Sequence, residues 1–287
     1  MSLSPSLVVS PTLFSVMLAL GLSLRPESMH HWRSRPGLPL RVLLGSCLVV
    51  PALALLLLET PWGWELSRPA RHAIALMAVC PSAPLALRKA GASGGDRQLA
   101  ALLQVSAAVA AIITIPLLAL VFRQTFHQDG WLIRPLDVAW QVGRVQVLPL
   151  LIGVLLRQRL PRLAERIGRP LEKLANALLI LLVVVVLLMA GPALVATIPA
   201  DPRALLAIAA LTAAALALGH WLGGQDRRER VTTALVTAMR NPGLALLFAT
   251  SHGQHLPGLK LWILAYVLIT VLLSVLLVGR ARRTLQP

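Results

Sequence analysis

Nine long apolar runs constrain this chain of 287 residues more than any other feature. Each run has about 15 residues or more, and a helix needs about 20 mostly apolar residues to cross a bilayer. Nine such helices take up about 180 residues and leave only loops and tails. The sequence therefore predicts an all-α polytopic membrane protein with nine transmembrane helices. Their expected spans are Ser6–Leu24, Leu38–Leu58, His72–Leu87, Gln98–Phe122, Val138–Leu156, Leu174–Pro199, Ala204–Gly223, Val231–Thr250 and Pro257–Gly279.

The composition also favours a membrane protein, since 57% of the residues are hydrophobic and 13% are charged. A soluble domain carries about twice that charge. We expect residues 1–287 to form a single integral membrane domain, which excludes a soluble enzyme. Cys47 and Cys80 both lie in apolar runs, so no disulfide framework is expected. No Lys or Arg precedes the first run, so no cleavable signal peptide is predicted.

The basic residues are distributed unevenly between the two sides of the predicted membrane. Of the 27 Lys and Arg residues, 19 fall on one side and six on the other, with Arg144 and Arg240 inside spans. The positive-inside rule then places the N-terminus outside and the C-terminus in the cytoplasm, in a bacterial-type inner membrane. The net charge of +16 comes from basic loop residues, which we expect to contact anionic lipid headgroups. No nucleic-acid partner is expected.

Two segments share a short pattern and run in opposite directions through the predicted membrane. Residues 85–90 and 244–249 both read Leu-Ala-Leu-x-x-Ala. Both segments carry helix breakers, namely Pro81 and Pro84 in the first and Pro242 and Gly243 in the second. Matching interrupted segments in two inverted halves are typical of the midplane site of a secondary transporter. They predict an inverted repeat with two broken, crossing helices; proline kinks that only aid packing are the alternative.

Three motifs give the chain a resemblance to a known family. Residues 16–24 are similar to a Met-x-Gly-Met-Gly-Leu-Thr-Leu signature, and Cys80-Pro81 is similar to a Cys-Pro-Gly-Gly element. Residues 239–245, which read Met-Arg-Asn-Pro-Gly-Leu-Ala, are similar to the crossover Met-Gln-Asn-Ser-Gly-Leu-Ala. These motifs are those of the bile acid:sodium symporter family, which the chain resembles over nearly its whole length as a nine-helix member.

The resemblance implies an architecture and a mode of action. It implies core helices within 38–122 and 202–279, and panel helices within 6–24 and 138–199. Substrate binds between core and panel in this family, and one moves against the other in alternating access. Bile-acid-like or other amphipathic anions are the substrates that the resemblance implies.

The sodium sites of the family have no matching ligands here. The resemblance places a glutamate at Val236, a glutamine at Arg240 and a Ser-Asn pair at residues 86–87, which are Ala and Leu. Hydroxyl ligands would fall within residues 100–108, where only Gln104 and Ser106 are polar. All 11 acidic residues lie in loops or at span ends. The sodium sites are thus degenerate, sodium is a doubtful partner, and no metal ligand or cofactor is predicted.

Arg240 is the most unusual residue of the predicted spans. It lies about ten residues into its span, roughly 15 Å deep. An arginine at that depth costs about 2.5–3.5 kcal/mol by insertion scales. We hypothesise that the guanidinium takes the place of sodium, binds helix C-terminal carbonyls at the crossing and leaves positive potential for an anion. A structural arginine paired only with backbone carbonyls is the alternative.

The function predicted is a secondary transporter of a small organic anion, such as a carboxylate or sulfonate, without sodium coupling. A sodium-coupled symporter of bile-acid-like anions and a non-transporting membrane sensor are the alternatives. No enzyme is expected, because no His, Asp or Cys cluster lies inside the spans. Gln104, Ser106 and Thr114 are expected on one helix face. The candidate substrate-binding residues are Arg240, Asn241, Thr237, Cys80, Pro81, Ser82, Gln104 and Ser106.

Overall fold

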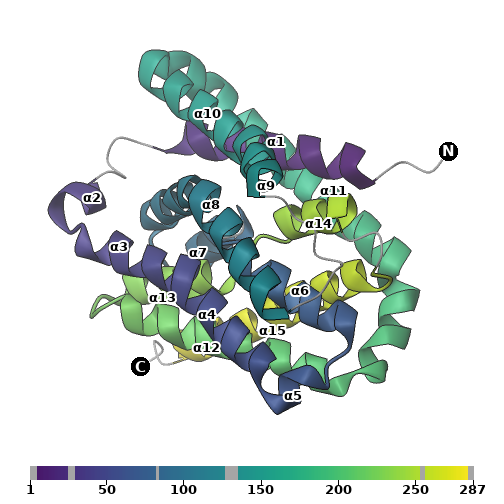
Figure 1. Ribbon diagram of the computed structural model, residues 1–287. Coiled ribbons are helices and arrows are strands. Elements are labelled where there is room, and N and C mark those ends of the chain that lie inside the picture. The colour runs from purple at the N-terminus through teal and green to yellow at the C-terminus, as the bar shows by residue number, and fades with distance from the viewer. Residues whose placement is uncertain (1–4, 25–29, 82–83, 127–134, 253–255, 284–287) are drawn as a thin grey trace.

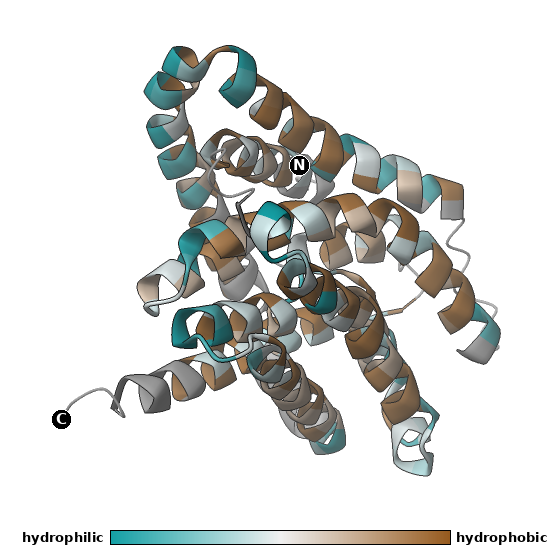
Figure 2. Cartoon of the chain, turned by 90° about the vertical axis from the view of Figure 1, so that its left-hand side faces the viewer, coloured by the Kyte–Doolittle hydropathy of each residue, from teal (hydrophilic) through white to brown (hydrophobic). Residues whose placement is uncertain are grey.

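The protein is helical throughout the part of the chain that the structure describes. The structure is a computed structural model that describes residues 5–24, 30–81, 84–126, 135–252 and 256–283 (Figure 1). Within these ranges it contains helices and short connections and no strand. Apolar residues cover the middle parts of the helices, and hydrophilic residues gather at helix ends and turns (Figure 2). The all-α membrane protein expected from the sequence is therefore present.

Six helical segments of the described residues are long and apolar enough to cross a membrane, and one of them, Arg227–Ser251, is interrupted between α13 and α14. Two of the other predicted spans are visible in shorter form, since Ser10–Ser23 is a shorter apolar helix and His72–Leu87 is interrupted. The third, Leu174–Pro199, lies within one long helix. The count of nine spans stays a prediction. The six candidates are Gly37–Glu59, Arg97–Gln124, Ala139–Arg159, Pro202–Leu222, Arg227–Ser251 and Leu259–Leu276.

One group of helices packs around the first helix of the chain, which contacts α10 and α11 most extensively. The group comprises α1 (Pro5–Ser23), α10 (Leu148–Arg159) and α11 (Pro161–Ala200). The short helix α9 (Pro135–Val142) leads into α10 and packs mainly against α8 (Arg97–Phe126). The first helix crosses α10 at two glycines, because a Cβ added at Gly21 would lie 2.9 Å from the Cα of Gly153. Small residues at such a crossing let two membrane helices approach closely.

The remaining helices form a second group, in which α15 packs against α6 and α12, and α12 packs against α13. Its members are α2 (His30–Ser34), α3 (Gly37–Leu44), α4 (Val50–Glu59), α5 (Pro61–Trp64), α6 (Arg68–Val79), α7 (Pro84–Ala92), α8 (Arg97–Phe126), α12 (Pro202–Leu222), α13 (Arg227–Ala238), α14 (Pro242–His252) and α15 (Leu259–Arg283). In Figure 1 the two groups lie one above the other, and α11 runs from the upper group along the edge of the lower one.

Two spans contain a π turn that the sequence analysis did not predict. Gly45–Val49 joins α3 to α4, and Gly143–Val147 joins α9 to α10. Each π turn begins at a glycine and ends two residues before a proline, Pro51 or Pro149. Because proline has no N–H, it cannot bond the carbonyl four residues earlier, and the helix widens in the preceding turn. Both spans are therefore locally distorted near their middle.

Candidate functional site

Both segments with predicted helix breakers are interrupted in the structure. The first helix of one segment, α6, ends at Val79, and Cys80 takes an extended conformation with φ −94° and ψ 90°. A residue before proline avoids the helical region, and Pro81 follows directly. In the other segment α13 ends at Ala238, Met239 is extended, and α14 begins at Pro242. Proline is favourable at the first helical position because its missing N–H would have no partner there.

The two interruptions contact each other directly. The backbone N–H of Asn241 donates to the carbonyl oxygen of Cys80 at 3.0 Å. The side-chain oxygen of Asn241 accepts from the N–H of Leu244 at 3.1 Å and so caps the first turn of α14. Both Asn241 and Cys80 are fully buried. One asparagine thus joins the two breaks and starts the second half-helix.

Arg240 fills the space beside this junction and is 2% exposed. Its guanidinium makes five hydrogen bonds, four of them to main-chain carbonyls. Nε donates to Met77 O at 3.1 Å, and Nη2 donates to Ala78 O. Nη1 donates to Thr237 O at 3.3 Å and to both the carbonyl and the hydroxyl of Ser46 at 3.0 Å. The side chain therefore ties α6, α13 and the first π turn together.

The chemistry of this arrangement follows from where the two helices end. The last carbonyls of a helix have no intrahelical partner, and they carry the negative end of the helix dipole. Met77 and Ala78 belong to the last turn of α6, and Thr237 belongs to the last turn of α13. A buried cation at this point satisfies carbonyls that hydrocarbon would leave unpaired. Arg240 supplies that cation from within the chain.

The other predicted site residues fall in several places. Thr237 is fully buried, and its hydroxyl has no partner within the described part of the chain. Pro81 is buried beside Cys80, and Ser82 lies outside the described residues. Arg240, Asn241, Thr237 and Cys80 therefore lie together at the contact between the two interrupted segments, which we call the crossing. The position of Ser82 is not described.

Gln104 and Ser106 do not share a face of α8, contrary to our expectation. Two residues on a helix are separated by about 200°, so one of them points away when the other points inward. The Ser106 hydroxyl accepts from the indole N–H of Trp32, on α2, at 3.3 Å. Gln104 is 1% exposed and lies in the interior. Their spacing of two residues should have predicted that they lie on different faces of the helix.

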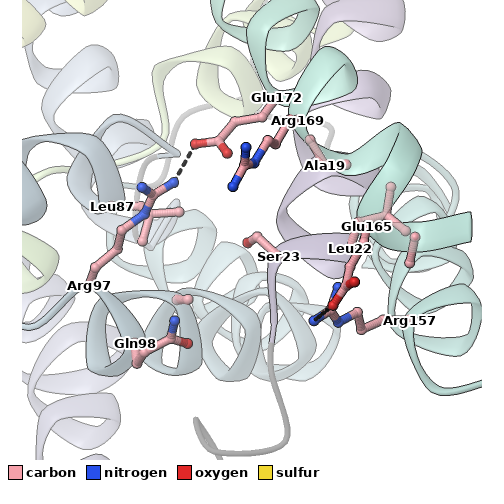
Figure 3. Close-up of a pocket in the computed structure, with 13 residues that line it drawn as sticks. Ala19, Leu22, Ser23, Leu87, Arg97, Gln98, Arg157, Glu165, Arg169 and Glu172 are labelled. Atoms are coloured by element: carbon pink, nitrogen blue, oxygen red, sulfur yellow. Dashed lines mark hydrogen bonds and ion pairs between the residues drawn. The ribbon is translucent and has the colours of Figure 1, made fainter. Parts of the chain in front are cut away.

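A cavity of about 700 Å³ opens between α1, α8, α10 and α11 (Figure 3). Its volume is typical of sites for small organic ligands, which occupy about 300–1,000 Å³. Apolar wall residues come from α1, α7, α8 and α11, and they are Ala19, Leu22, Leu87, Ala101 and Ala164. Arg240 is not among the residues that line it. The cavity and the crossing are therefore separate features of the molecule.

Three arginines and two glutamates line the cavity. Arg97 pairs with Glu172 across the space between α8 and α11, and Arg157 pairs with Glu165 at 3.2 Å. Arg169 points into the cavity in Figure 3, and its guanidinium has no hydrogen bond or ion pair with any described residue. The cavity therefore carries an uncompensated positive charge.

A smaller recess of about 30 Å³ continues the cavity. The two share the wall residues Ala19, Ser23, Leu87 and Glu172. Gln104 and Asn176 line the recess, as does Arg88, whose guanidinium also has no partner within the described ranges.

The cavity residues were missed although the sequence holds a signal for several of them. Glu165, Arg169, Glu172 and Asn176 are spaced four, three and four residues apart, which places them on one helix face. We had expected a loop before Leu174, whereas α11 begins at Pro161. Since Pro161 lies at the first helical position and the polar residues keep helical spacing, a longer helix was the better interpretation.

Sodium does not fit the residues at the implied sodium positions. Val236, Ala86, Leu87 and Ala100 are all buried in one apolar cluster. Hard cations are bound by carboxylate, carbonyl and water oxygens, which these side chains cannot supply. The nearby backbone carbonyls of Met77, Ala78, Ser46 and Thr237 already accept from Arg240. Apolar side chains therefore occupy four of the implied sodium positions, and the guanidinium of Arg240 occupies the space beside the nearby carbonyls.

Comparison with known proteins identifies relatives. A profile described as the sodium bile acid symporter family matches residues 10–197. This match confirms the family resemblance seen in the sequence. A rice protein (Oryza sativa subsp. japonica) named probable sodium/metabolite cotransporter BASS2, chloroplastic, is 26% identical over 248 residues. Those residues are 83% of this chain and 55% of the rice protein, so the chain spans about half the length of that relative.

Proposed function

Because the chain belongs to the sodium bile acid symporter family, we propose that it is a secondary transporter that moves a small organic anion across a membrane by alternating access. The cavity of about 700 Å³ is the observation that carries this proposal. It has the volume of a small-molecule site, a mostly polar lining with several apolar wall residues, and a guanidinium without a partner among the described residues. An amphipathic carboxylate or sulfonate matches these three properties.

The position of the cavity supports alternating access. Its walls come from α1, α10 and α11 on one side and from α7 and α8 on the other. These correspond to the panel and core that the family resemblance implies. A substrate in this cavity contacts both groups, so movement of one group against the other exposes it to the opposite side. With the C-terminus in the cytoplasm, as the charge distribution favours, the cavity faces the cytoplasm.

We propose further that transport needs no sodium, because Arg240 provides a permanent positive charge at the crossing. Four of its five hydrogen bonds use main-chain oxygens that a bound cation would need. The rice relative is named as a sodium/metabolite cotransporter, and sodium coupling through backbone carbonyls and Asn241 is the alternative. Against that alternative, the Asn241 side-chain oxygen already caps α14. A direct contact between Arg240 and the substrate stays a prediction.

The test is the thermal stability of the purified full chain with a panel of linear carboxylates and sulfonates, each in sodium chloride and in potassium chloride. We expect some anions to raise the melting temperature equally in both salts, and the matching primary amides to have no effect. Stabilisation that requires sodium would favour the coupled alternative. Uptake of the stabilising anions into proteoliposomes then tests transport, and its absence would favour the non-transporting sensor.

A further inference from the structure

We propose that Gln104 recognises an uncharged hydrogen-bonding group, such as a hydroxyl, on the anion that the cavity binds. The inference rests on the proposed function and narrows the substrate class to anions with a second polar group. It depends on Gln104, the recess beside it and the charged cavity beyond.

Gln104 is a buried carboxamide with no hydrogen bond to any residue that the structure describes. It is 1% exposed, and within that part of the chain neither its side-chain oxygen nor its side-chain nitrogen has a partner. A buried polar group without a partner is destabilising, and a leucine at the same position would avoid the penalty. The carboxamide therefore has no structural role that the described contacts account for, whereas a ligand would supply its missing partner.

The recess has the size of the group that would complete this site. Its volume of about 30 Å³ is enough for a water molecule or a hydroxyl, since a water needs about 10–15 Å³ of such space. Asn176 lines the same recess from α11. A hydroxyl both donates and accepts, and a carboxamide offers one acceptor and two donors. Gln104 can thus bond the same hydroxyl in either direction.

The distance along α8 defines how far apart the two ends of the substrate lie. Gln104 follows Arg97 by seven residues, which corresponds to about 10 Å along the helix axis. Arg97 lines the wide part of the cavity, and the apolar residues Ala19 and Leu87 line both this part and the recess. A linear anion can match these regions if its charged group lies near Arg97, its apolar chain lies against Ala19 and Leu87, and its terminal hydroxyl reaches Gln104.

The experiment compares linear carboxylates with and without a terminal hydroxyl. We would measure binding of butanoate, hexanoate and octanoate and of their ω-hydroxy counterparts to the purified full chain. The variant is Gln104→Leu, and the matched control is Thr114→Val. Thr114 lies on the same helix, and its hydroxyl also has no partner among the residues that the structure describes. It lines neither the cavity nor the recess.

We expect at least one hydroxy acid to bind roughly tenfold more tightly than its parent acid, as one hydrogen bond to an otherwise unpaired group allows. Gln104→Leu should remove this preference, retain binding of the parent acid and raise the melting temperature of the ligand-free protein. Thr114→Val should keep the preference. If the wild type shows no preference, or if Gln104→Leu keeps it, a recess filled only by water is the result and the inference is wrong. If no anion binds at all, the proposed function itself fails.

Discussion

Two arginines of this protein lie in opposite chemical situations. The guanidinium of Arg240 is buried and makes five hydrogen bonds, all within the protein. The guanidinium of Arg169 is exposed in the cavity and has no partner among the residues that the structure describes. The first sits where two helices break, and the second sits on the regular helix α11.

The difference in hydrogen bonding distinguishes an arginine that stabilises the fold, Arg240, from one that is available to bind a ligand, Arg169. A guanidinium has five N–H donors in a fixed geometry, and every donor group of Arg240 already points at an oxygen of the chain. Arg169 keeps all its donors for another molecule. If this reading is right, substitutions at the two positions should affect different measurements.

The largest effect is expected from Arg240→Met. The substitution removes the guanidinium donors from the carbonyls of Ser46, Ala78 and Thr237 in a water-free region. The carbonyl of Met77 still accepts from the N–H of Cys80 at 3.2 Å. Each unsatisfied buried group costs about 1–3 kcal/mol, so we expect a loss of at least about 3 kcal/mol of folding free energy. Fluorescence-detected size exclusion and thermal unfolding would measure the loss of folded protein.

Arg169→Met is the matched control for this prediction, because it removes the same charge from an exposed position. We expect its folding to be nearly unchanged. Equal destabilisation by the two substitutions would show that the hydrogen bonds at the crossing contribute little to stability.

A smaller effect, on binding rather than folding, is expected from Arg169→Gln. Removing the unpaired guanidinium should weaken anion binding roughly tenfold, which corresponds to about 1.4 kcal/mol. Because the cavity is open to solvent, salt screens this interaction, and the difference from the wild type should shrink at high ionic strength. Isothermal titration with a stabilising carboxylate at low and high potassium chloride would measure both quantities. An unchanged affinity at low salt would remove Arg169 from the binding site.

The elements that the sequence predicted well are those with local causes. Proline fixes the backbone of its neighbours, so Pro81 and Pro242 located both interruptions without any knowledge of tertiary structure. Counting residues along one span also singled out Arg240 as an interior residue, and its side chain is 2% exposed. Its depth in the membrane stays a prediction. Local chemistry was sufficient for these features.

The partners of Arg240 could not be predicted, because they come from distant parts of the chain. Ser46 lies 194 positions away, and Met77 lies 163 positions away. Their main-chain oxygens carry no sequence signature, and the π turn that contains Ser46 also went unpredicted. The cavity depends on the packing of α1 and α8 against α11 in the same way.

The smallest effect is expected from Glu172→Gln, which removes a negative charge from the same cavity that contains Arg169. The ion pair of Glu172 with Arg97 has side chains that are 38% and 54% exposed, and such pairs contribute about 0.2–1 kcal/mol. We therefore expect little change in the melting temperature. Freeing Arg97 should instead strengthen anion binding about two- to threefold, opposite in sign to the effect of Arg169→Gln.

Glu165→Gln, which frees Arg157 in the same cavity, should act in the same direction. If Glu172→Gln weakens binding as much as Arg169→Gln does, the carboxylate itself contacts the ligand, and the cavity selects a substrate that also carries a donor group rather than a simple anion.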